Sequence, residues 1–229
     1  MKKFIVLFLF LTFNFVQGQS INIWFRTTFS YPFKNNISVD MEFQHRRQQG
    51  FEDDHPLHKN LVFSARSWVH YSFDNNGKLH LAPLAYYKLY APIQKIEDES
   101  RPAQKELRSS LGYSYQYKLT DKFSVNGRAM LEYRIFLQKN NWFRQRSRLG
   151  AKYQINDVYG LVFQEEILLN LNGFFKTNFY DQNRITLGVQ KKTRKQNYEL
   201  GYMYVDRLPQ RSSDHFSDHN FYINLIFYL

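Results

Sequence analysis

The sequence predicts an all-β fold, a single antiparallel transmembrane β-barrel of about 10–12 strands preceded by a cleaved signal peptide. Three observations predict it. Apolar and polar residues alternate along most of the chain, many alternating segments exceed the five or six residues typical of soluble strands, and the last segment alternates up to an apolar C-terminus. A strand that presents one face to lipid and the other to water needs all three features.

The N-terminus has the three parts of a secretory signal. A basic pair is followed by an apolar run that ends at Phe13 and by the small-residue cleavage context Val16-Gln17-Gly18. The apolar run is shorter than the roughly 20 residues that a membrane-spanning helix needs, so we expect cleavage after Gly18 rather than anchoring. The predicted division is therefore a signal peptide at 1–18 and an outer-membrane β-barrel domain at 19–229.

The composition agrees with alternation. The chain holds 22 Phe and 17 Tyr against 3 Trp, yet its mean hydropathy of −0.56 is that of a soluble protein. An average over a lipid-facing and a water-facing set of residues produces this combination. Cysteine is absent, so disulfides do not stabilise the chain, and no linker-like stretch divides it.

The clearest alternation lies between Leu107 and Leu119, where the odd positions are mostly Leu and Tyr and the even positions are polar or small. The segment from Phe123 to Leu137 repeats the pattern, and Thr120-Asp121 joins the two as a hairpin. The same test predicts eleven strands, at about 21–31, 36–48, 60–73, 78–90, 104–119, 122–138, 141–155, 158–171, 179–191, 196–207 and 217–229.

Short and long connections alternate, as they do between the periplasmic turns and outer loops of a barrel. The longer polar connections are expected at 49–59, 91–103, 172–178 and 208–216. An odd strand count with a periplasmic C-terminus leaves the start of the first strand on the outer side, so we expect ten or twelve strands rather than eleven. A secreted β-sandwich is the rival fold, and the strand lengths and aromatic weight disfavour it.

Segments of the C-terminal half resemble a known family. The segments 144–149, 164–171, 179–189 and 198–204 are similar to the strands that mark the domain-of-unknown-function 2490 family. The resemblance is strongest from about 104 to 229, and Trp24 with the pair Arg46 and Arg47 resembles the family's opening. It implies an exported outer-membrane barrel and supplies no catalytic residues.

Charged residues concentrate on the strand face that we expect to point into the lumen. The predicted lumen charge network consists of Arg128, Glu132, Arg134, Arg144, Arg146, Arg148, Glu166, Arg184 and Glu199. The register of the hairpin through Lys139 to Asn141 sets Glu132 roughly opposite Arg146, and unlike charges that face each other across strands stabilise a sheet. The favoured interpretation is a salt-bridge network that fills a narrow barrel. An arginine-lined pore or pocket for carboxylates or phosphates is the alternative, and the lumen width distinguishes them.

One residue pair suggests hydrolysis. His70 and Ser72 share a strand face and resemble the pair used by a barrel-type lipid A deacylase, but the sequence identifies no carboxylate partner. His80 is expected to be an ordinary polar partner of His70. No Gly-rich phosphate loop, nucleophile elbow or metalloprotease motif is present, so we do not expect an enzyme.

Two long loops carry residues that suit divalent metals. These residues are His55, His58, His215 and His219 with Asp53, Asp54, Asp214 and Asp218. Their spacing fits no tight motif, so we predict no metal site and no cofactor.

The partners expected from the sequence are those of the envelope. The 31 basic residues exceed the 20 acidic ones, but they are spread through strands and turns with no nucleic-acid-binding module. We expect contact with outer-membrane lipid and lipopolysaccharide, to which Arg101, Lys105 and Arg108 are assigned, and with the barrel assembly machinery, which reads the final strand.

The sequence thus predicts a monomeric protein of the cell outer membrane, structural or binding in role, with a charged and largely filled lumen. The first alternative is a narrow porin-like channel for small anionic solutes or oligosaccharides. The second is a membrane-embedded lipid hydrolase.

Overall fold

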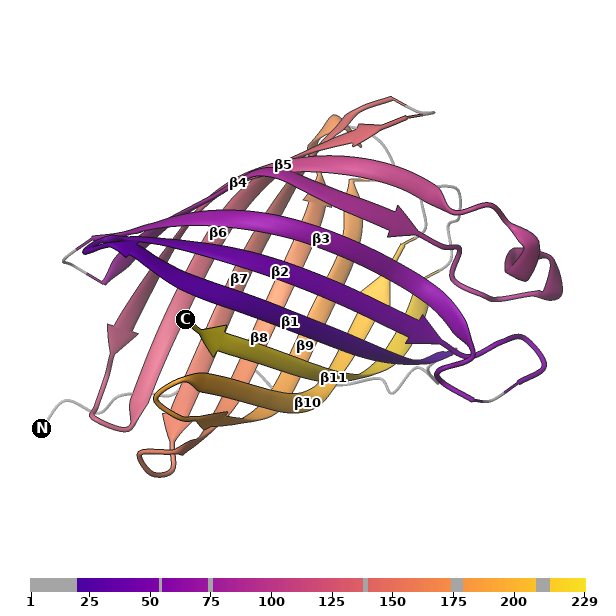
Figure 1. Cartoon of the computed structure of the whole chain (residues 1–229). Helices are drawn as coiled ribbons and strands as arrows, with labels where there is room; N and C mark the ends of the chain where they lie inside the picture. Colours follow the sequence, from indigo (N-terminus) through magenta and orange to yellow (C-terminus); the bar gives the residue numbers. More distant parts are fainter. Residues whose placement is uncertain (1–19, 54, 74–75, 138–139, 174–178, 209–214) are drawn as a thin grey trace, which may run out of the picture.

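The computed structural model describes residues 20–53, 55–73, 76–137, 140–173, 179–208 and 215–229. These residues form one closed barrel of eleven strands (Figure 1). The predicted signal peptide and its cleavage after Gly18 lie outside the described residues. Among the residues that are described, no helix is long and apolar enough to cross a membrane.

All eleven predicted strands are present, and their ends differ from the expected ones by a few residues. They are β1 (Ser20–Lys34), β2 (Ile37–Gln48), β3 (Lys59–Ser72), β4 (Gly77–Leu89), β5 (Gln104–Lys118), β6 (Phe123–Phe136), β7 (Trp142–Gln154), β8 (Tyr159–Asn170), β9 (Tyr180–Lys192), β10 (Gln196–Arg207) and β11 (Phe216–Tyr228). Two short 3-10 helices, η1 (Ile96–Ser100) and η2 (Leu171–Gly173), lie in the longer connections.

The barrel closes through a parallel pair. Each strand runs antiparallel to the next in the chain, whereas β1 pairs with β11 in parallel, from Ser20 opposite Asp218 to Ser30 opposite Tyr228. Both strands run from the end with the long loops to the end with the short turns (Figure 1). The expectation of ten or twelve strands is therefore wrong. A parallel ladder satisfies the two edge strands as an antiparallel one does, so closure does not require an even count.

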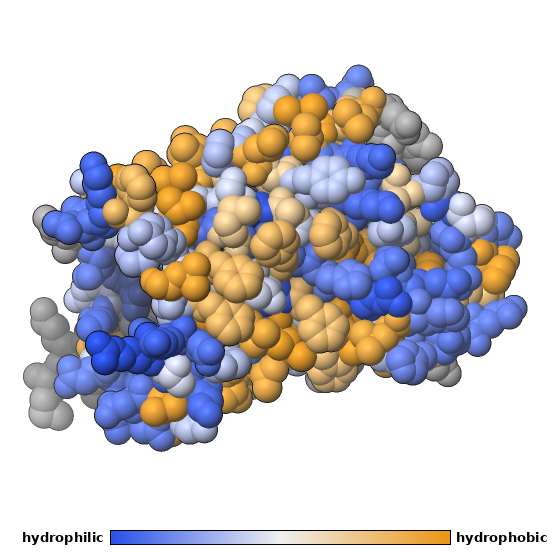
Figure 2. All heavy atoms as spheres, viewed as in Figure 1, coloured by the Kyte–Doolittle hydropathy of each residue, from blue (hydrophilic) through white to orange (hydrophobic). Residues whose placement is uncertain are grey.

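The alternation of the sequence becomes two surfaces of the barrel wall. On β5, Leu111, Tyr113 and Tyr115 are exposed on the outside, whereas Arg108 and Ser110 are buried in the lumen. Figure 2 shows apolar side chains gathered over the middle of the visible wall and polar ones at its two ends. The outer surface thus has the apolar band, flanked by polar rims, that a bilayer requires.

Polar side chains shape the short turns. Between β5 and β6, the hydroxyl of Thr120 accepts a hydrogen bond from the backbone N–H of Phe123 at 3.0 Å. Between β7 and β8, the side chain of Asn156 accepts one from Tyr159 N–H at 2.8 Å. Asn76, between β3 and β4, has a φ of 65°, a left-handed conformation that asparagine tolerates better than most residues. These turns set the register of the hairpins.

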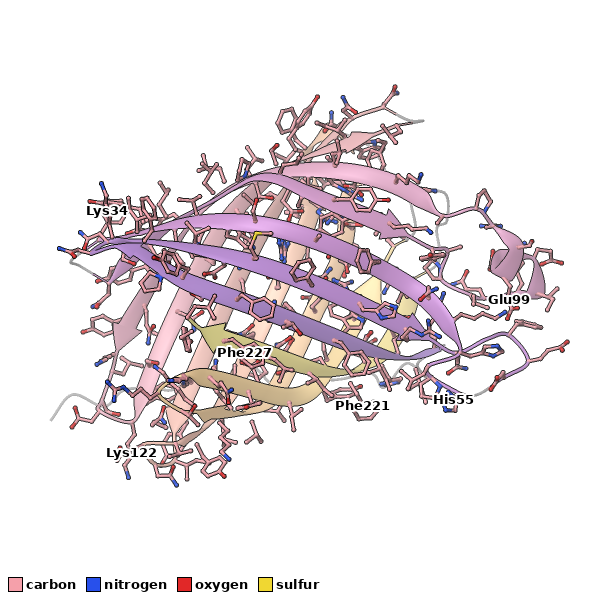
Figure 3. The ribbon with its side chains drawn as sticks, in the orientation of Figure 1. Lys34, His55, Glu99, Lys122, Phe221 and Phe227 are labelled. Carbon is pink, nitrogen blue, oxygen red and sulfur yellow. The ribbon has the colours of Figure 1, made fainter. Side chains whose placement is uncertain are left out.

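At the end of the barrel away from the short turns, the loop between β2 and β3 is joined to the loop between β4 and β5. The carboxylate of Glu99 accepts hydrogen bonds from Phe51 N–H and from the Lys59 ammonium, each at 2.8 Å. The bond from Lys59 is the main cause that lowers the pKa of Glu99 below its usual value. Figure 3 places Glu99 and His55 at the loop end, and Lys34 and Lys122 at the turn end.

The parallel closure predicts a specific disulfide. The rings of Phe29 and Phe227 stack with centroids 5.5 Å apart at register-paired positions. Adjacent strands lie about 4.8 Å apart, within the span of a disulfide, and the native chain has no cysteine. We expect a Phe29→Cys/Phe227→Cys variant to cross-link on oxidation, which changes the mobility of the denatured monomer in a gel until reductant is added.

The control pair for this test is Phe29→Cys/Phe221→Cys. Phe221 is paired with Ile23, six positions from Phe29, which is about 20 Å along the strand. The control variant should therefore not cross-link within the monomer. A cross-link in the control and none in the first pair would mean that β1 and β11 do not pair in this register.

Candidate functional site

The centre of the lumen is built around the carboxylate of Glu132 on β6, which is completely buried. Arg144, its register partner on β7, donates from Nε and Nη2 to Oε2 at 2.9 and 2.6 Å. Arg146 donates from Nη1 to Oε1 at 2.8 Å. The expected register, with Arg146 roughly opposite Glu132, is off by two positions along β7, although the two residues do form an ion pair. A shift of two keeps every side chain on its face, so the alternation of the sequence did not reveal it.

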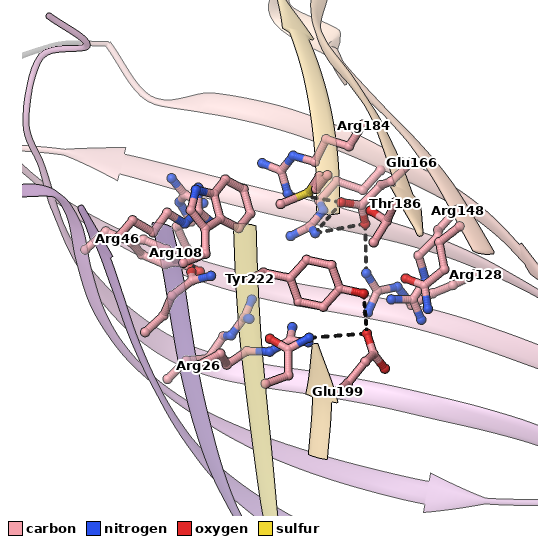
Figure 4. A pocket seen from close by; sticks show the side chains of 18 of the residues that line it. Arg26, Arg46, Arg108, Arg128, Arg148, Glu166, Arg184, Thr186, Glu199 and Tyr222 are labelled. Carbon is pink, nitrogen blue, oxygen red and sulfur yellow. Dashed lines mark hydrogen bonds and ion pairs between the residues drawn. The ribbon is translucent and has the colours of Figure 1, made fainter. Parts of the chain in front are cut away.

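A second carboxylate, Glu166 on β8, extends the network around the wall (Figure 4). It accepts hydrogen bonds from Arg146 and Arg128 at 2.8 Å and from Arg184 at 3.2 Å. Arg146 therefore bridges Glu132 on β6 and Glu166 on β8, and Arg184 on β9 joins the cluster through Glu166. Six of the nine residues predicted for the lumen network lie in this cluster.

A third carboxylate, Glu106 on β5, was missed by the sequence reasoning. It is completely buried and accepts paired hydrogen bonds from Arg108 and from Arg134, at 2.6 and 3.0 Å in each case. Arg134 therefore lies in the lumen as predicted, but in this separate cluster. The assignment of Arg108 to lipopolysaccharide is wrong, because its position on the even-numbered face of β5 directs it inward. Arg101, by contrast, is exposed and pairs with Asp98 at 3.1 Å.

Two predicted network residues form no ion pair in the described part of the chain. Glu199 on β10 accepts hydrogen bonds from the Tyr222 hydroxyl at 3.0 Å and from Asn224 at 3.4 Å instead of from an arginine. Arg148 lies opposite Glu166 in the register, yet its buried Nε has no hydrogen-bond partner. The carboxylate of Glu166 already accepts hydrogen bonds from Arg146 and Arg128, and Arg148 forms none with it.

A cavity of about 150 Å³ adjoins this network. Its lining includes two carboxylates, Glu166 and Glu199, and nine arginines: Arg26, Arg46, Arg66, Arg108, Arg128, Arg144, Arg146, Arg148 and Arg184. The sequence reasoning did not place Arg26, Arg46 or Arg66 in the lumen. These three arginines alternate with outward-facing residues on β1, β2 and β3, and this alternation could have shown that they face the lumen. It was overlooked because the pattern is weaker on these strands.

A separate hydrogen-bonded chain lies toward the turn end. His70 Nε2 is 3.1 Å from Asp40 Oδ2, His80 Nδ1 is 2.9 Å from His70 Nδ1, and His80 Nε2 is 2.7 Å from Ser114 Oγ. The predicted pairing of His70 with His80 is confirmed. Ser72 is exposed at the end of β3, and no hydrogen bond joins it to His70 among the described residues. The His70–Ser72 pair suggested by the sequence is therefore not assembled.

The histidines of the long loops form local pairs. His58 Nδ1 lies 2.5 Å from Asp53 Oδ2, and His215 Nδ1 lies 2.9 Å from Asp206 Oδ2. Asp54 and Asp214 lie outside the described residues. Within the residues described, no group of three or more potential ligands is placed to hold a metal ion.

Solved structures with a similar fold are outer-membrane barrels. The NanC porin matches with a TM-score of 0.54 and 12% identity, over 92% of this chain and 99% of its own. An anion-selective porin from Comamonas acidovorans matches with a TM-score of 0.37 and 13% identity, over 84% of this chain and 56% of its own. OmpT of Vibrio cholerae matches with a TM-score of 0.39 and 13% identity, over 74% of this chain and 54% of its own. At these identities only the fold is shared, and the two lower scores support no argument.

In sequence, none of the curated proteins matches this chain. Residues 21–214 match the family described as Protein of unknown function (DUF2490), which agrees with the resemblance found in the strands of the C-terminal half. The chain is an outer-membrane-type β-barrel and belongs to the DUF2490 family.

Proposed function

We propose that this protein is a monomeric β-barrel of the cell outer membrane whose charged lumen is largely filled, and that it acts as a structural or binding protein of the envelope. The observation that carries the proposal is the bridge of Arg146 between Glu132 and Glu166. A side chain that is held from two sides by buried carboxylates is not free to move aside for a passing solute.

The outer surface supports the membrane location. Leu149, Leu187 and Leu200 are between 56% and 71% exposed on the outer face of β7, β9 and β10, where water would not favour them. The fold shared with the NanC porin points to the same membrane. Lipid and lipopolysaccharide are accordingly the proposed surroundings, and the barrel assembly machinery the proposed partner in folding.

The size of the interior supports occlusion. Eleven strands lie between the roughly eight whose interior is filled by side chains and the roughly sixteen that leave an aqueous channel, so the packing of the lumen decides whether a passage remains. The cavity has a volume of about 150 Å³, which is small for the lumen of a conducting barrel. This supports a lumen that is mostly packed with side chains.

The alternative of a narrow channel for small anionic solutes or oligosaccharides also has an observation in its favour. Nine arginines line the cavity, and a positive lining selects anions in a pore. The alternative of a lipid hydrolase built on His70 and Ser72 is not supported, because His70 is hydrogen-bonded to Asp40 and His80 instead of to Ser72. Conductance separates the filled lumen from the channel.

We expect the purified, refolded protein to produce no ohmic current steps in a planar lipid bilayer, because the bridged network occupies the lumen. A triple variant, Glu132→Ser/Arg144→Ser/Arg146→Ser, removes the long side chains at its centre and should conduct.

The triple variant is a positive control: current steps from it show that an absence of current from the wild-type protein is not caused by failed insertion. Folding of both proteins is checked by the shift of the band between heated and unheated gel samples. Salt-dependent steps from the wild-type protein would contradict the filled lumen and favour the channel.

The network also predicts a stability effect. Glu132→Gln removes the charge that two buried arginines share, so we expect the free energy of unfolding to fall by about 3 kcal/mol. The measurement is urea unfolding in lipid vesicles. Glu52→Gln, in the exposed loop between β2 and β3, is the control and should change it by no more than about 0.5 kcal/mol. Equal effects of the two substitutions would show that the network does not brace the barrel.

A further inference from the structure

Four of the arginines that line the cavity have an Nε without a hydrogen-bond partner in the described part of the chain. The buried Nε atoms of Arg46, Arg66, Arg146 and Arg148 have no hydrogen-bond partner among the described residues, and all four side chains line this cavity. A guanidinium N–H can only donate, so another basic group cannot satisfy it. Buried polar groups are normally paired, so these four side chains of the lining keep donor capacity that the described residues do not use.

The charges show the same imbalance. Arg26 and Arg148 form no ion pair in the described part of the chain, and Arg46 donates only to the uncharged side chain of Gln44, at 3.0 Å. Glu166 already serves three arginines, and Glu199 is occupied by Tyr222 and Asn224. Figure 4 shows Arg26 and Arg46 on one side of Tyr222 and Arg148 on the other. Among the described residues, the arginines that line the cavity therefore outnumber the ion pairs that its carboxylates form.

We propose that this cavity binds a compact oxyanion with two or more negative charges, of the phosphate, sulfate or short dicarboxylate type. Such a ligand has several acceptor oxygens, which match the planar fork of donors that arginine presents. A cavity of about 150 Å³ has room for a ligand of a few non-hydrogen atoms. The proposal rests on the proposed function in its binding form, because it names the class of ligand that the lumen would hold.

Trp24 provides the signal for a binding test. The Arg46 guanidinium lies 3.4 Å from the centre of the Trp24 ring and that of Arg184 lies 5.4 Å from it. An anion that draws these two groups toward itself changes the surroundings of the indole. Trp24 fluorescence should therefore report occupancy, and Trp24→Phe identifies its contribution.

The test titrates the folded full chain in detergent with inorganic phosphate and, separately, with succinate, at constant ionic strength set by chloride. We expect a saturable fluorescence change with at least one of the two, matched by heat in calorimetry. Arg46→Gln and Arg148→Gln should each weaken binding about tenfold or more, the usual effect of losing a hydrogen bond to a charged group.

Arg47→Gln is the matched control. Arg47 is the next residue on β2 and carries the same charge, but it donates to Leu57 and His58 carbonyl oxygens in the loop and does not line the cavity. It should leave the affinity unchanged. Equal weakening by Arg46→Gln and Arg47→Gln would reveal a general charge effect and overturn the site.

No saturable signal from the wild-type protein with phosphate or succinate, in fluorescence and calorimetry alike, would also overturn it. Conductance of the same preparation tests the proposed function independently. Current steps together with saturable binding would reject the filled lumen and support the binding site. No current steps and no binding would support the filled lumen and reject the binding site.

Discussion

Buried charge inside a narrow barrel has to be paired, and the lumen is organised by this constraint. Glu132 has no contact with solvent and is held by Arg144 and Arg146. Arg146 continues to Glu166, which Arg128 and Arg184 also reach. Because the participants come from four consecutive strands, the same contacts that neutralise the carboxylates also tie one side of the wall together. Breaking one pair would leave a charge that neither lipid nor the remaining side chains can solvate.

The network does not balance the whole interior, and the imbalance is local. Around Glu132 and Glu106 each carboxylate faces two arginines at close range, whereas Arg26, Arg46 and Arg148 border the cavity without a carboxylate partner. Aromatic rings cover part of this excess, since Arg46 lies over Trp24 and Arg66 lies 4.5 Å from the Trp68 ring centre. Trp68 also stacks on His70, so it contacts both Arg66, which lines the cavity, and the histidine chain toward the turn end.

Much of the fold was predictable because it depends on a local pattern. A period of two places alternate residues on opposite faces whatever the partner strand, which is why the strands and the inward direction of Arg128, Arg144 and Arg146 were correct. Arg108 follows the same rule, but its proximity to a long loop suggested the wrong environment. Arg26 and Arg66 lie on strands with weaker alternation. Glu106 stands near the start of its strand, where the pattern alone does not separate lumen from loop.

The sequence by itself determined that the chain alternates, how long the strands are and which residues turn inward, since each depends on neighbours along the chain. Only the tertiary structure decided the partners. Arg128 meets Glu166 across 38 positions of sequence, and Arg144 rather than Arg146 stands opposite Glu132. The parallel closure of β1 on β11 is likewise invisible locally, because it joins the two ends of the barrel. Alternation leaves any even shift of register equally good, and only the complete set of pairings selects one.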